Sequence, residues 1–479
     1  MTEKLEKLIS DSKATRWTVL FLVSFTMLAA YYFVDAIAPL ELLLEQSYKW
    51  TPDNYGFFSG SEYMLNICGF LILSGIILDK MGIRFTGLLS CCIMLLGGSI
   101  KVYALSEYYK NGGFAFDFFN SFWPSLPATA KLAAVGYAIF GVGVEMCGIT
   151  VSRTVVKWFK GRELALAMGM QLSTARLGAS CAFFFSALIA GYKENVNMVD
   201  GITTVTYSGH VINPIILGLA LMTIGFLTFL IYTFQDRKLD KQTGRTSDAD
   251  PSEAFRLSDL KKIITNPGFW AISFMCVLFY SGVFPFLKYA VPMMQSKLGV
   301  SPEMGGMISG LLPVGTIILT PIFGSFLDRK GKGASIMILG SLILMLAHLI
   351  FALVPLNLVL AICSILLLGI AFSLIPSSMW PSLAKIIPEK YLGSAYALVF
   401  FIQNIGLWFI PWFIGMVLNW ANPGVSEKIA AGDPNAVYNY TVPMLVFAAL
   451  GLAAVVLGFW LKSVDKKQGY GLELPNIKK

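Results

Sequence analysis

One arginine lies in the middle of a long apolar segment. Arg176 stands in "QLSTARLGAS" (171–180), inside an apolar run that extends from residue 164 to residue 191. A charged side chain within such a run is costly to desolvate, and charges inside membrane segments usually serve function. Because a guanidinium binds a carboxylate through two parallel hydrogen bonds, Arg176 is a candidate ligand for an anionic group.

A carboxylate lies at nearly the same depth on the preceding apolar segment. The basic turn 157–163 joins the two segments. Glu145 lies 12 residues before Lys157, about 18 Å of helix, and Arg176 lies 14 residues after Arg162, about 21 Å. If the two charges had only a structural role, Glu145 and Arg176 would form a buried ion pair. Such a pair roughly breaks even in stability at best, so we interpret both charges as part of a binding site.

The composition is that of an integral membrane protein. Of 479 residues, 56% are hydrophobic and 13% are charged, against about a quarter charged in soluble domains. The net charge of +8 does not indicate nucleic acid binding, because the basic residues lie in short loops. All seven cysteines lie in apolar segments, which is not a disulfide or zinc pattern. No P-loop or nucleophile elbow is present. We therefore expect no enzyme activity, cofactor or metal.

Twelve apolar segments are long enough to cross a bilayer. They begin near residues 17, 54, 83, 130, 163, 212, 268, 304, 333, 357, 391 and 441. The longest charged stretch lies between the sixth and the seventh. The sequence therefore predicts an all-α membrane protein of two six-helix bundles. The predicted parts are an N-terminal arm (1–16), a bundle (17–234), a linker (235–266), a second bundle (267–462) and a C-terminal tail (463–479).

The positive charges predict the orientation of the chain. With twelve crossings, both termini, the linker and every second loop lie on one side. These parts carry 26 of the 36 lysines and arginines. Because cytoplasmic loops are enriched in Lys and Arg, we expect both termini to be cytoplasmic.

Two loops repeat at the same point of each six-segment half. "GIILDKMGIR" (75–84) follows the second segment, and "GSFLDRKGKG" (324–333) follows the eighth. Asp79 and Asp328 occupy matching positions, and each loop also carries an arginine, Arg84 at the end of the first and Arg329 next to Asp328 in the second. Such residues can form latches that open, so we assign all four a gating role.

The paired loops and the six-plus-six repeat resemble the major facilitator superfamily along nearly the whole chain. This resemblance implies two pseudosymmetric bundles that rock around a midplane site to give alternating access. The segments 158–178, 284–287 and 379–407 are similar to one branch, the lysosomal dipeptide transporters and their bacterial relatives. That branch uses charged residues at the positions of Arg176 and Glu145 for peptide binding.

The chain departs from a common pattern of that superfamily in one place. Tyr137, in "VGYAIFG", stands where many facilitators carry an arginine linked to proton-driven exchange. This difference weakens the case for proton coupling.

Other polar and aromatic residues complete the predicted site. Tyr31, Tyr280 and Trp380 are expected to bound the cavity, although Trp380 beside a proline can equally be a packing residue. Gln403 and Asn404 lie about 20 Å into the eleventh segment. This is the corresponding depth in the second half.

A further pair of charges lies at homologous positions in the two halves. Asp35 and Lys288 stand near the outer ends of the first and seventh segments. They are expected either to form a gate between the bundles or to reach the outer water separately.

The leading functional hypothesis is a secondary transporter of a small zwitterion, in particular a short peptide. An organic-anion carrier, in which Glu145 only holds Arg176, and a non-transporting receptor are the alternatives. The expected partners are the small-molecule substrate and the lipid bilayer, with no nucleic acid, and a monomer is the expected unit. A bacterial cytoplasmic membrane is favoured over a lysosomal one.

Overall fold

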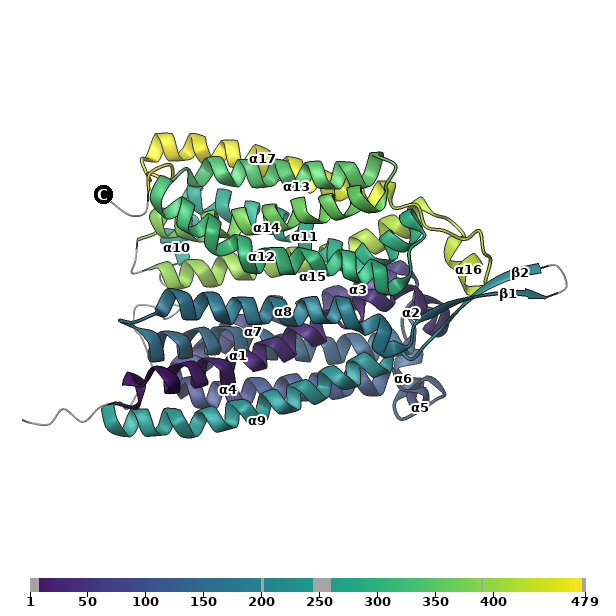
Figure 1. Cartoon of the computed structure of the whole chain (residues 1–479), viewed down its shortest axis with the longest axis horizontal. Coiled ribbons are helices and arrows are strands. Elements are labelled where there is room, and N and C mark those ends of the chain that lie inside the picture. The colour runs from purple at the N-terminus through teal and green to yellow at the C-terminus, as the bar shows by residue number, and fades with distance from the viewer. Residues whose placement is uncertain (1–7, 200–201, 244–259, 389–390, 476–479) are drawn as a thin grey trace, which may run out of the picture.

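The computed structural model describes residues 8–199, 202–243, 260–388 and 391–475. Long helices run side by side through the molecule (Figure 1). They are α1 (Lys13–Asp35), α3 (Pro52–Ser61), α4 (Leu71–Ala104), α7 (Ala128–Phe159), α8 (Leu164–Ala190), α9 (Ile212–Thr243), α11 (Pro267–Leu298), α12 (Pro302–Lys330), α13 (Gly333–Leu353), α14 (Leu358–Ile386), α15 (Leu392–Ala421) and α17 (Thr441–Gln468).

Short elements connect the long helices or continue them. They are the 3-10 turns η1 (Ile9–Asp11) and η2 (Ala38–Leu40), the π-helical turn η3 (Asn66–Phe70), the helices α2 (Glu41–Tyr48), α5 (Glu107–Lys110), α6 (Phe116–Asn120), α10 (Leu260–Ile264) and α16 (Val425–Ala430), and the strands β1 (Lys193–Val199) and β2 (Ile202–Ser208).

One helical segment crosses the membrane twice. Of the described residues, eleven segments are long and apolar enough to cross, and one of them, Pro52–Ala104, has 53 residues. That is about 80 Å of helix for about 30 Å of hydrocarbon. The Tyr48 hydroxyl donates to Leu105 O at 2.7 Å, so the residues flanking the segment lie together. The chain turns back at Gly82 (φ 76°, ψ 172°). The predicted twelve-helix fold is therefore confirmed.

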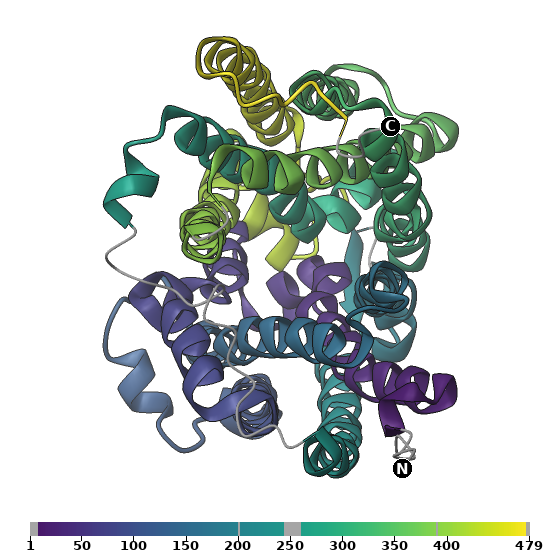
Figure 2. The same cartoon turned by 90° about the vertical axis from the view of Figure 1, so that its left-hand side faces the viewer.

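The crossings form two bundles in chain order (Figures 1 and 2). The N-terminal bundle contains α1, α3, α4 and α7–α9, and the C-terminal bundle contains α11–α15 and α17. The main contacts between the bundles are those of α3 with α15 and of α8 with α12. Most of the predicted linker, 244–259, lies outside the described residues. Helix α9 continues to Thr243, past the predicted boundary at 234.

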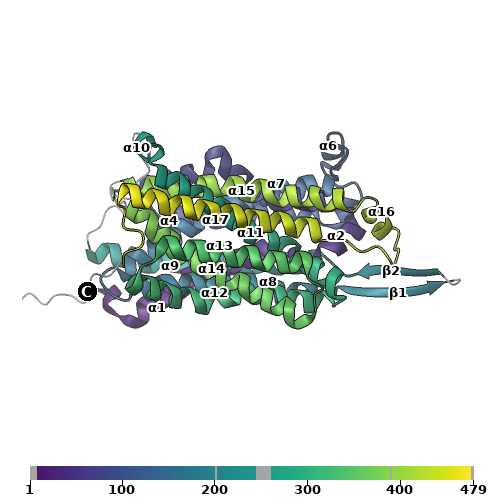
Figure 3. The same ribbon diagram turned by 90° about the horizontal axis from the view of Figure 1, so that it is seen from above.

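The molecule has two distinct ends, which Figure 3 shows from above. We call the end where η1 and the C-terminal segment lie the terminal end. We call the opposite end, which carries β1, β2, α2, α5, α6 and α16, the hairpin end.

The β-hairpin between α8 and α9 is a feature that our sequence analysis missed. β1 pairs with β2 in antiparallel register from Lys193 with Ser208 to Val199 with Ile202. Gln46 of α2 joins the base of the hairpin, because its Oε1 accepts a hydrogen bond from the backbone N–H of Tyr207 at 2.5 Å. The signal was available, since alternating β-formers flank the dipeptide Asp-Gly at 200–201, which is typical of a hairpin.

Four glycines bring the backbones of the two bundles together near the hairpin end. A Cβ added to any of them would lie 2.1–2.3 Å from a backbone oxygen of the other bundle. This glycine seam consists of Gly56, Gly60, Gly306 and Gly415. Toward the terminal end, by contrast, a Cβ at Gly75, Gly315 or Gly324 would have no neighbour within 4 Å. Close backbone contact through small residues is a common way to pack membrane helices, and here it closes the hairpin end.

Candidate functional site

Arg176 lies between the two bundles, surrounded by aromatic rings. It projects from the middle of α8. Its guanidinium carbon lies 4.6 Å from the ring centroid of Phe372, 5.5 Å from that of Phe284 and 6.0 Å from that of Tyr31. Cation–π contacts of this kind each contribute about 0.5–2 kcal/mol. Two of these rings belong to the C-terminal bundle, so Arg176 links the bundles through aromatic faces.

Glu145 lies on α7 and is not paired with Arg176. Across the residues that the structure describes, no hydrogen bond or ion pair joins the two side chains. Tyr31 lies within electrostatic reach of both side chains. Glu145 also lies within electrostatic reach of a second carboxylate, Glu62. The matching depth predicted from the sequence is therefore not accompanied by direct contact in this arrangement. A positive and a negative group stand apart on one side of the interface.

The C-terminal bundle contributes an aromatic wall and two amides. The ring of Tyr280 packs on Phe284 and Phe372 at centroid distances of 5.7 and 5.9 Å. The ring of Trp380 packs on Phe400 at 4.8 Å. Of these rings, Phe284 of α11 and Phe372 of α14 face Arg176 of the N-terminal bundle.

Gln403 and Asn404 are both buried on α15. Gln403 Oε1 accepts a hydrogen bond from the Cys276 thiol at 3.4 Å, and Asn404 Nδ2 donates to Phe400 O at 3.0 Å. These bonds are weak or local, so both amides can exchange their partners for a ligand.

The second membrane crossing is broken near its middle, which our sequence analysis also missed. The turn η3 separates α3 from α4, and Gly69 has φ 102° inside it. Asn66 Nδ2 donates to Gly141 O at 3.3 Å, while Asn66 Oδ1 is buried with no partner among the described residues. Interrupted helices at mid-membrane often mark transporter binding sites. The run "NICGF" carried the signal, because it places Asn and Gly within one helical turn.

Tyr137, at the position where the resemblance led us to expect an arginine, belongs to a buried polar group. Its hydroxyl lies 2.8 Å from Glu62 Oε2 and 2.9 Å from Val34 O. Glu62 is thereby held inside the N-terminal bundle.

Asp35 and Lys288 form an ion pair between the bundles close to the hairpin end. Lys288 Nζ lies 2.8 Å from Asp35 Oδ1 and 3.2 Å from Val34 O. The Tyr55 hydroxyl donates to Lys288 O at 3.1 Å, and the Tyr289 hydroxyl lies 2.8 Å from Pro411 O. Of the two sequence-based alternatives, the structure has the paired arrangement and not two separately solvated charges.

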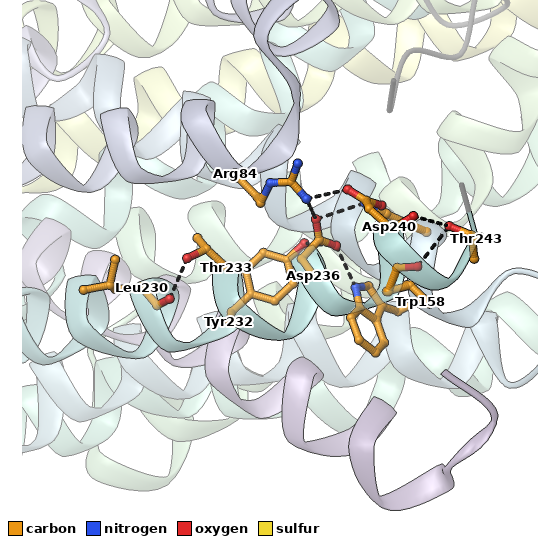
Figure 4. A network of polar contacts seen from close by, with 10 residues as sticks. Arg84, Trp158, Leu230, Tyr232, Thr233, Asp236, Asp240 and Thr243 are labelled. Carbon is orange, nitrogen blue, oxygen red and sulfur yellow. Dashed lines mark hydrogen bonds and ion pairs between the residues drawn. The ribbon is translucent and has the colours of Figure 1, made fainter. Parts of the chain in front are cut away.

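We call the two repeated loops, 75–84 and 324–333, the first and second latch loops. At the terminal end, the first latch loop is bound within its own bundle. Asp79 Oδ1 accepts from Arg153 Nη1 at 2.8 Å. Arg153, which lies in the last two turns of α7, therefore has a carboxylate partner. Arg84 binds Asp236 at 3.0 Å and also binds Asp240 (Figure 4).

Asp236 is the centre of this terminal-end network. It also accepts from Lys157 at 3.0 Å and from the Trp158 indole at 3.1 Å. Asp236 and Asp240 lie one helical turn apart on α9, and both bind Arg84 and Lys157. These ion pairs stabilise the part of α9 that continues beyond the predicted boundary.

The second latch loop is covered by the C-terminal segment. The backbone N–H groups of Lys332 and Gly333 donate to Glu473 O and Leu472 O, each at 3.0 Å. The Glu473 carboxylate binds Ser335 at the start of α13. Asp328 lies within electrostatic reach of Lys385, and Arg329 is exposed at the end of α12.

The N-terminal segment is fastened to the turn between α7 and α8. Arg162 binds Asp11, and Arg16 binds Glu163 at 2.9 Å. The hydrogen bond from Arg162 lowers the pKa of Asp11, and the hydrogen bond from Arg16 lowers the pKa of Glu163. Both carboxylates therefore stay ionised to a lower pH than unpaired carboxylates would, and these contacts are lost only on stronger acidification.

Curated relatives of this chain are animal transporters. The chain is 28% identical over 416 residues to the lysosomal dipeptide transporters MFSD1 of Bos taurus and Homo sapiens. The alignment covers 85% of this chain and 80% of each relative. The MFSD1 of Gallus gallus is 30% identical over 311 residues, which is 63% of each chain.

Solved structures share the fold. A bacterial homologue of the human lysosomal transporter Spinster, in an inward-facing and unoccupied conformation, matches with TM-score 0.68 and 15% identity over 95% of this chain and 98% of that chain. The nucleoside transporter NupG matches with TM-score 0.66 and 12% identity over 93% of this chain and 99% of that chain.

The family model for the Major Facilitator Superfamily matches residues 20–411 and 287–473, and thus nearly the whole chain. This match agrees with the two bundles, the repeated latch loops and the charged residues at their interface. The chain belongs to the Major Facilitator Superfamily, a family of membrane transporters.

Proposed function

We propose that this protein is a secondary transporter of small zwitterions, with short peptides as its substrate class. The main support for this proposal is the arrangement of Arg176 and Glu145. Arg176 and Glu145 stand near the bundle interface without an ion pair between them in the described structure, and aromatic rings hold Arg176 from both bundles. The likeness to dipeptide transporters supports the same substrate class.

The charges suit the two ends of a peptide. The guanidinium of Arg176 takes the carboxylate in a bidentate pair, and Glu145 takes the amino group. The rings of Tyr31, Tyr280 and Trp380 bound the space between, and the amides of Gln403 and Asn404 supply hydrogen bonds from the other bundle.

Transport follows from rocking of the bundles around this site. The described arrangement is closed at the hairpin end by the Asp35–Lys288 pair and the glycine seam. Breaking these contacts opens that end, and the loops carrying Asp79 and Asp328 then close the terminal end. The bias of Lys and Arg supports a cytoplasmic terminal end, and a bacterial inner membrane is the proposed location.

Uptake into proteoliposomes tests the role of Arg176. Arg176→Ala removes both hydrogen bonds of the bidentate pair to the carboxylate, so we expect dipeptide uptake to fall at least about 100-fold, since each charged hydrogen bond contributes about 1.5–3 kcal/mol. Arg237→Ala, which removes an exposed arginine of the same bundle, is the matched control. Wild-type uptake by a folded Arg176→Ala protein would exclude the proposed role.

Ligand-induced thermal stabilisation separates the zwitterion from the organic-anion alternative. A dipeptide should raise the melting temperature, whereas its N-acetylated form and a dicarboxylate should not, because they give Glu145 no cation to bind. Equal stabilisation by all three ligands would favour the organic-anion carrier. Saturable binding without uptake would favour a receptor.

A further inference from the structure

Two buried glutamates lie at the hairpin end, outside the proposed substrate site. Glu41 and Glu45 are each 1% exposed. They are one turn apart on α2, so their Cβ atoms are about 5–6 Å apart. Helix α2 packs against α3 and β2 of the N-terminal half and against α11 and α16 of the C-terminal half. The two carboxyl groups are therefore enclosed between the halves when the hairpin end is closed.

The hydrogen bonds of these carboxyl groups are incomplete for two anions. Glu45 Oε1 accepts from the Ser426 hydroxyl and, at 2.6 Å, from the Tyr438 hydroxyl, both in the C-terminal half. Both oxygens of Glu41 and Oε2 of Glu45 are buried with no partner among the described residues. An ionised carboxylate is an acceptor only, with about four lone-pair sites, so two anions would leave most of these sites empty.

The surrounding groups do not supply positive charge. Within the described residues, no lysine, arginine or histidine forms an ion pair with either glutamate. The titratable groups that face the pair are acids and phenols: Asp53, Tyr55, Tyr192, Tyr207, Tyr289, Glu427, Tyr438 and Tyr440.

Protonation of one carboxyl group removes one buried negative charge and reduces the number of acceptor sites left empty. Burying an unpaired carboxylate is very costly, and two like charges side by side disfavour each other. A neutral acid carries no charge to desolvate, and the two neighbouring carboxyl groups then no longer repel each other.

We propose that Glu41 and Glu45 form a proton-binding site, which holds at least one proton while the hairpin end is closed and releases it when water enters on opening. The proton passes between a carboxyl oxygen and water on the hairpin side, and no other bond changes. The closed state then binds more protons than the open state. Acidification on that side favours closure about tenfold per pH unit for each proton.

This proposal rests on the proposed function only for the existence of a hairpin-end-open state. The proton itself is measured without transport. Loss of dipeptide uptake would contradict the proposed function and leave the proton site standing.

Infrared spectroscopy of the purified full chain tests the bound proton directly. At neutral pH, the wild type should show a carbonyl band of a buried protonated carboxyl, which shifts on deuteration. The double variant Glu41→Gln/Glu45→Gln should lose that band. Glu107→Gln, which changes a 72% exposed side chain at the same end, should keep it. A double variant with an unchanged carboxyl band would overturn the proposal.

A second variant covers the case in which the double variant does not fold. Tyr438→Phe removes one donor to Glu45 and keeps both acids, so the same band should move to higher frequency. An unmoved band would count against the site.

Accessibility measurements test the link to opening. A cysteine at Ser59, which is 2% exposed and near Tyr55, is introduced into a background without native cysteines. Its alkylation from the hairpin side should slow up to tenfold for each unit by which the pH falls. The double glutamine variant should lose this dependence. A rate that responds to sodium instead of pH would identify a metal cation site and overturn the proton assignment.

Discussion

At the scale of single residues, Arg176 shows how a costly charge is retained in an apolar helix. Aromatic faces from both bundles partly replace the water that the guanidinium loses. Such contacts are weaker than a bidentate carboxylate bond, so a substrate carboxylate can displace them. The site is thus stable when empty and is still able to bind.

The Asp35–Lys288 pair provides a prediction at the same scale. Asp35→Asn leaves Lys288 as a buried cation without its carboxylate. Breaking a buried ion pair costs about 3–5 kcal/mol, and the cost falls on the closed hairpin end, where the pair exists. We expect alkylation of a cysteine at Ser59 from the hairpin side to accelerate at least about 100-fold.

The charge-swapped double variant Asp35→Lys/Lys288→Asp is the matched control, because it restores an ion pair across the interface. It should recover much of the slow alkylation rate. If Asp35→Asn labels at the wild-type rate, the pair does not stabilise closure.

Sequence alone predicted the depth of the charged residues but not their contacts. Counting 1.5 Å per residue placed Glu145 and Arg176 at one level. Contact also depends on the rotation of each helix about its axis and on the separation of the axes, which packing determines. For the same reason, the partner of Arg153 at Asp79 could not be found by counting residues.

At the scale of elements, the glycine seam determines how closely α3 and α15 approach. The nearest atom at each of these glycines is a backbone oxygen, which cannot move aside as a flexible side chain can. The interface therefore depends on the absence of a side chain at Gly56, Gly60 and Gly415.

The seam predicts a strong effect of a single methyl group. In Gly415→Ala, the new Cβ would lie 2.2 Å from Pro52 O, so α15 must move away from α3. We expect the hairpin end to remain open and dipeptide uptake to fall at least tenfold. Gly315→Ala on α12 meets nothing within 4 Å and should transport normally. Normal uptake by Gly415→Ala would show that the seam is not required for closure.

Two elements escaped the sequence analysis because apolar periodicity does not reveal them. The hairpin lies between two strong hydropathy segments and reads as a connecting loop unless its β-pattern is examined. The π-helical turn at Asn66–Phe70 leaves the hydropathy of its segment unchanged, so only the Asn and Gly within one helical turn point to it in the sequence, and the backbone angles of Gly69 show it in the structure.

At the scale of the whole molecule, the sequence predicted the twelve crossings and their division into two bundles. It did not predict which end of the molecule is closed. Hydropathy reports the transfer of each helix into lipid, which is the same in every state of the transporter. Which end is closed depends on a small difference between two sets of contacts, such as the Asp35–Lys288 pair and the seam. That difference has no simple signature in composition or periodicity.

The arrangement predicts that fixing the hairpin end stops transport. Asn419 Nδ2 donates to Asp53 Oδ1 across the interface, so cysteines at positions 53 and 419 should form a disulfide in a background without native cysteines. Under oxidation, dipeptide uptake should fall to the background rate and should recover after reduction. Either single cysteine variant should transport under both conditions. Continued uptake by the oxidised pair would argue against opening of this end during transport.

The glycine seam also bears on the character of the motion. Side-chain interfaces can loosen gradually as rotamers change. Backbone atoms in a helix have no rotamers, so two backbones in contact cannot keep that contact as the helices move apart. Once one glycine of the α3–α15 part of the seam separates, the contacts of the other two lose their geometry with it, because Gly56, Gly60 and Gly415 lie on the same pair of helices. The hairpin end therefore behaves as a cooperative switch with two discrete positions, and a partly open intermediate gains little from either set of contacts.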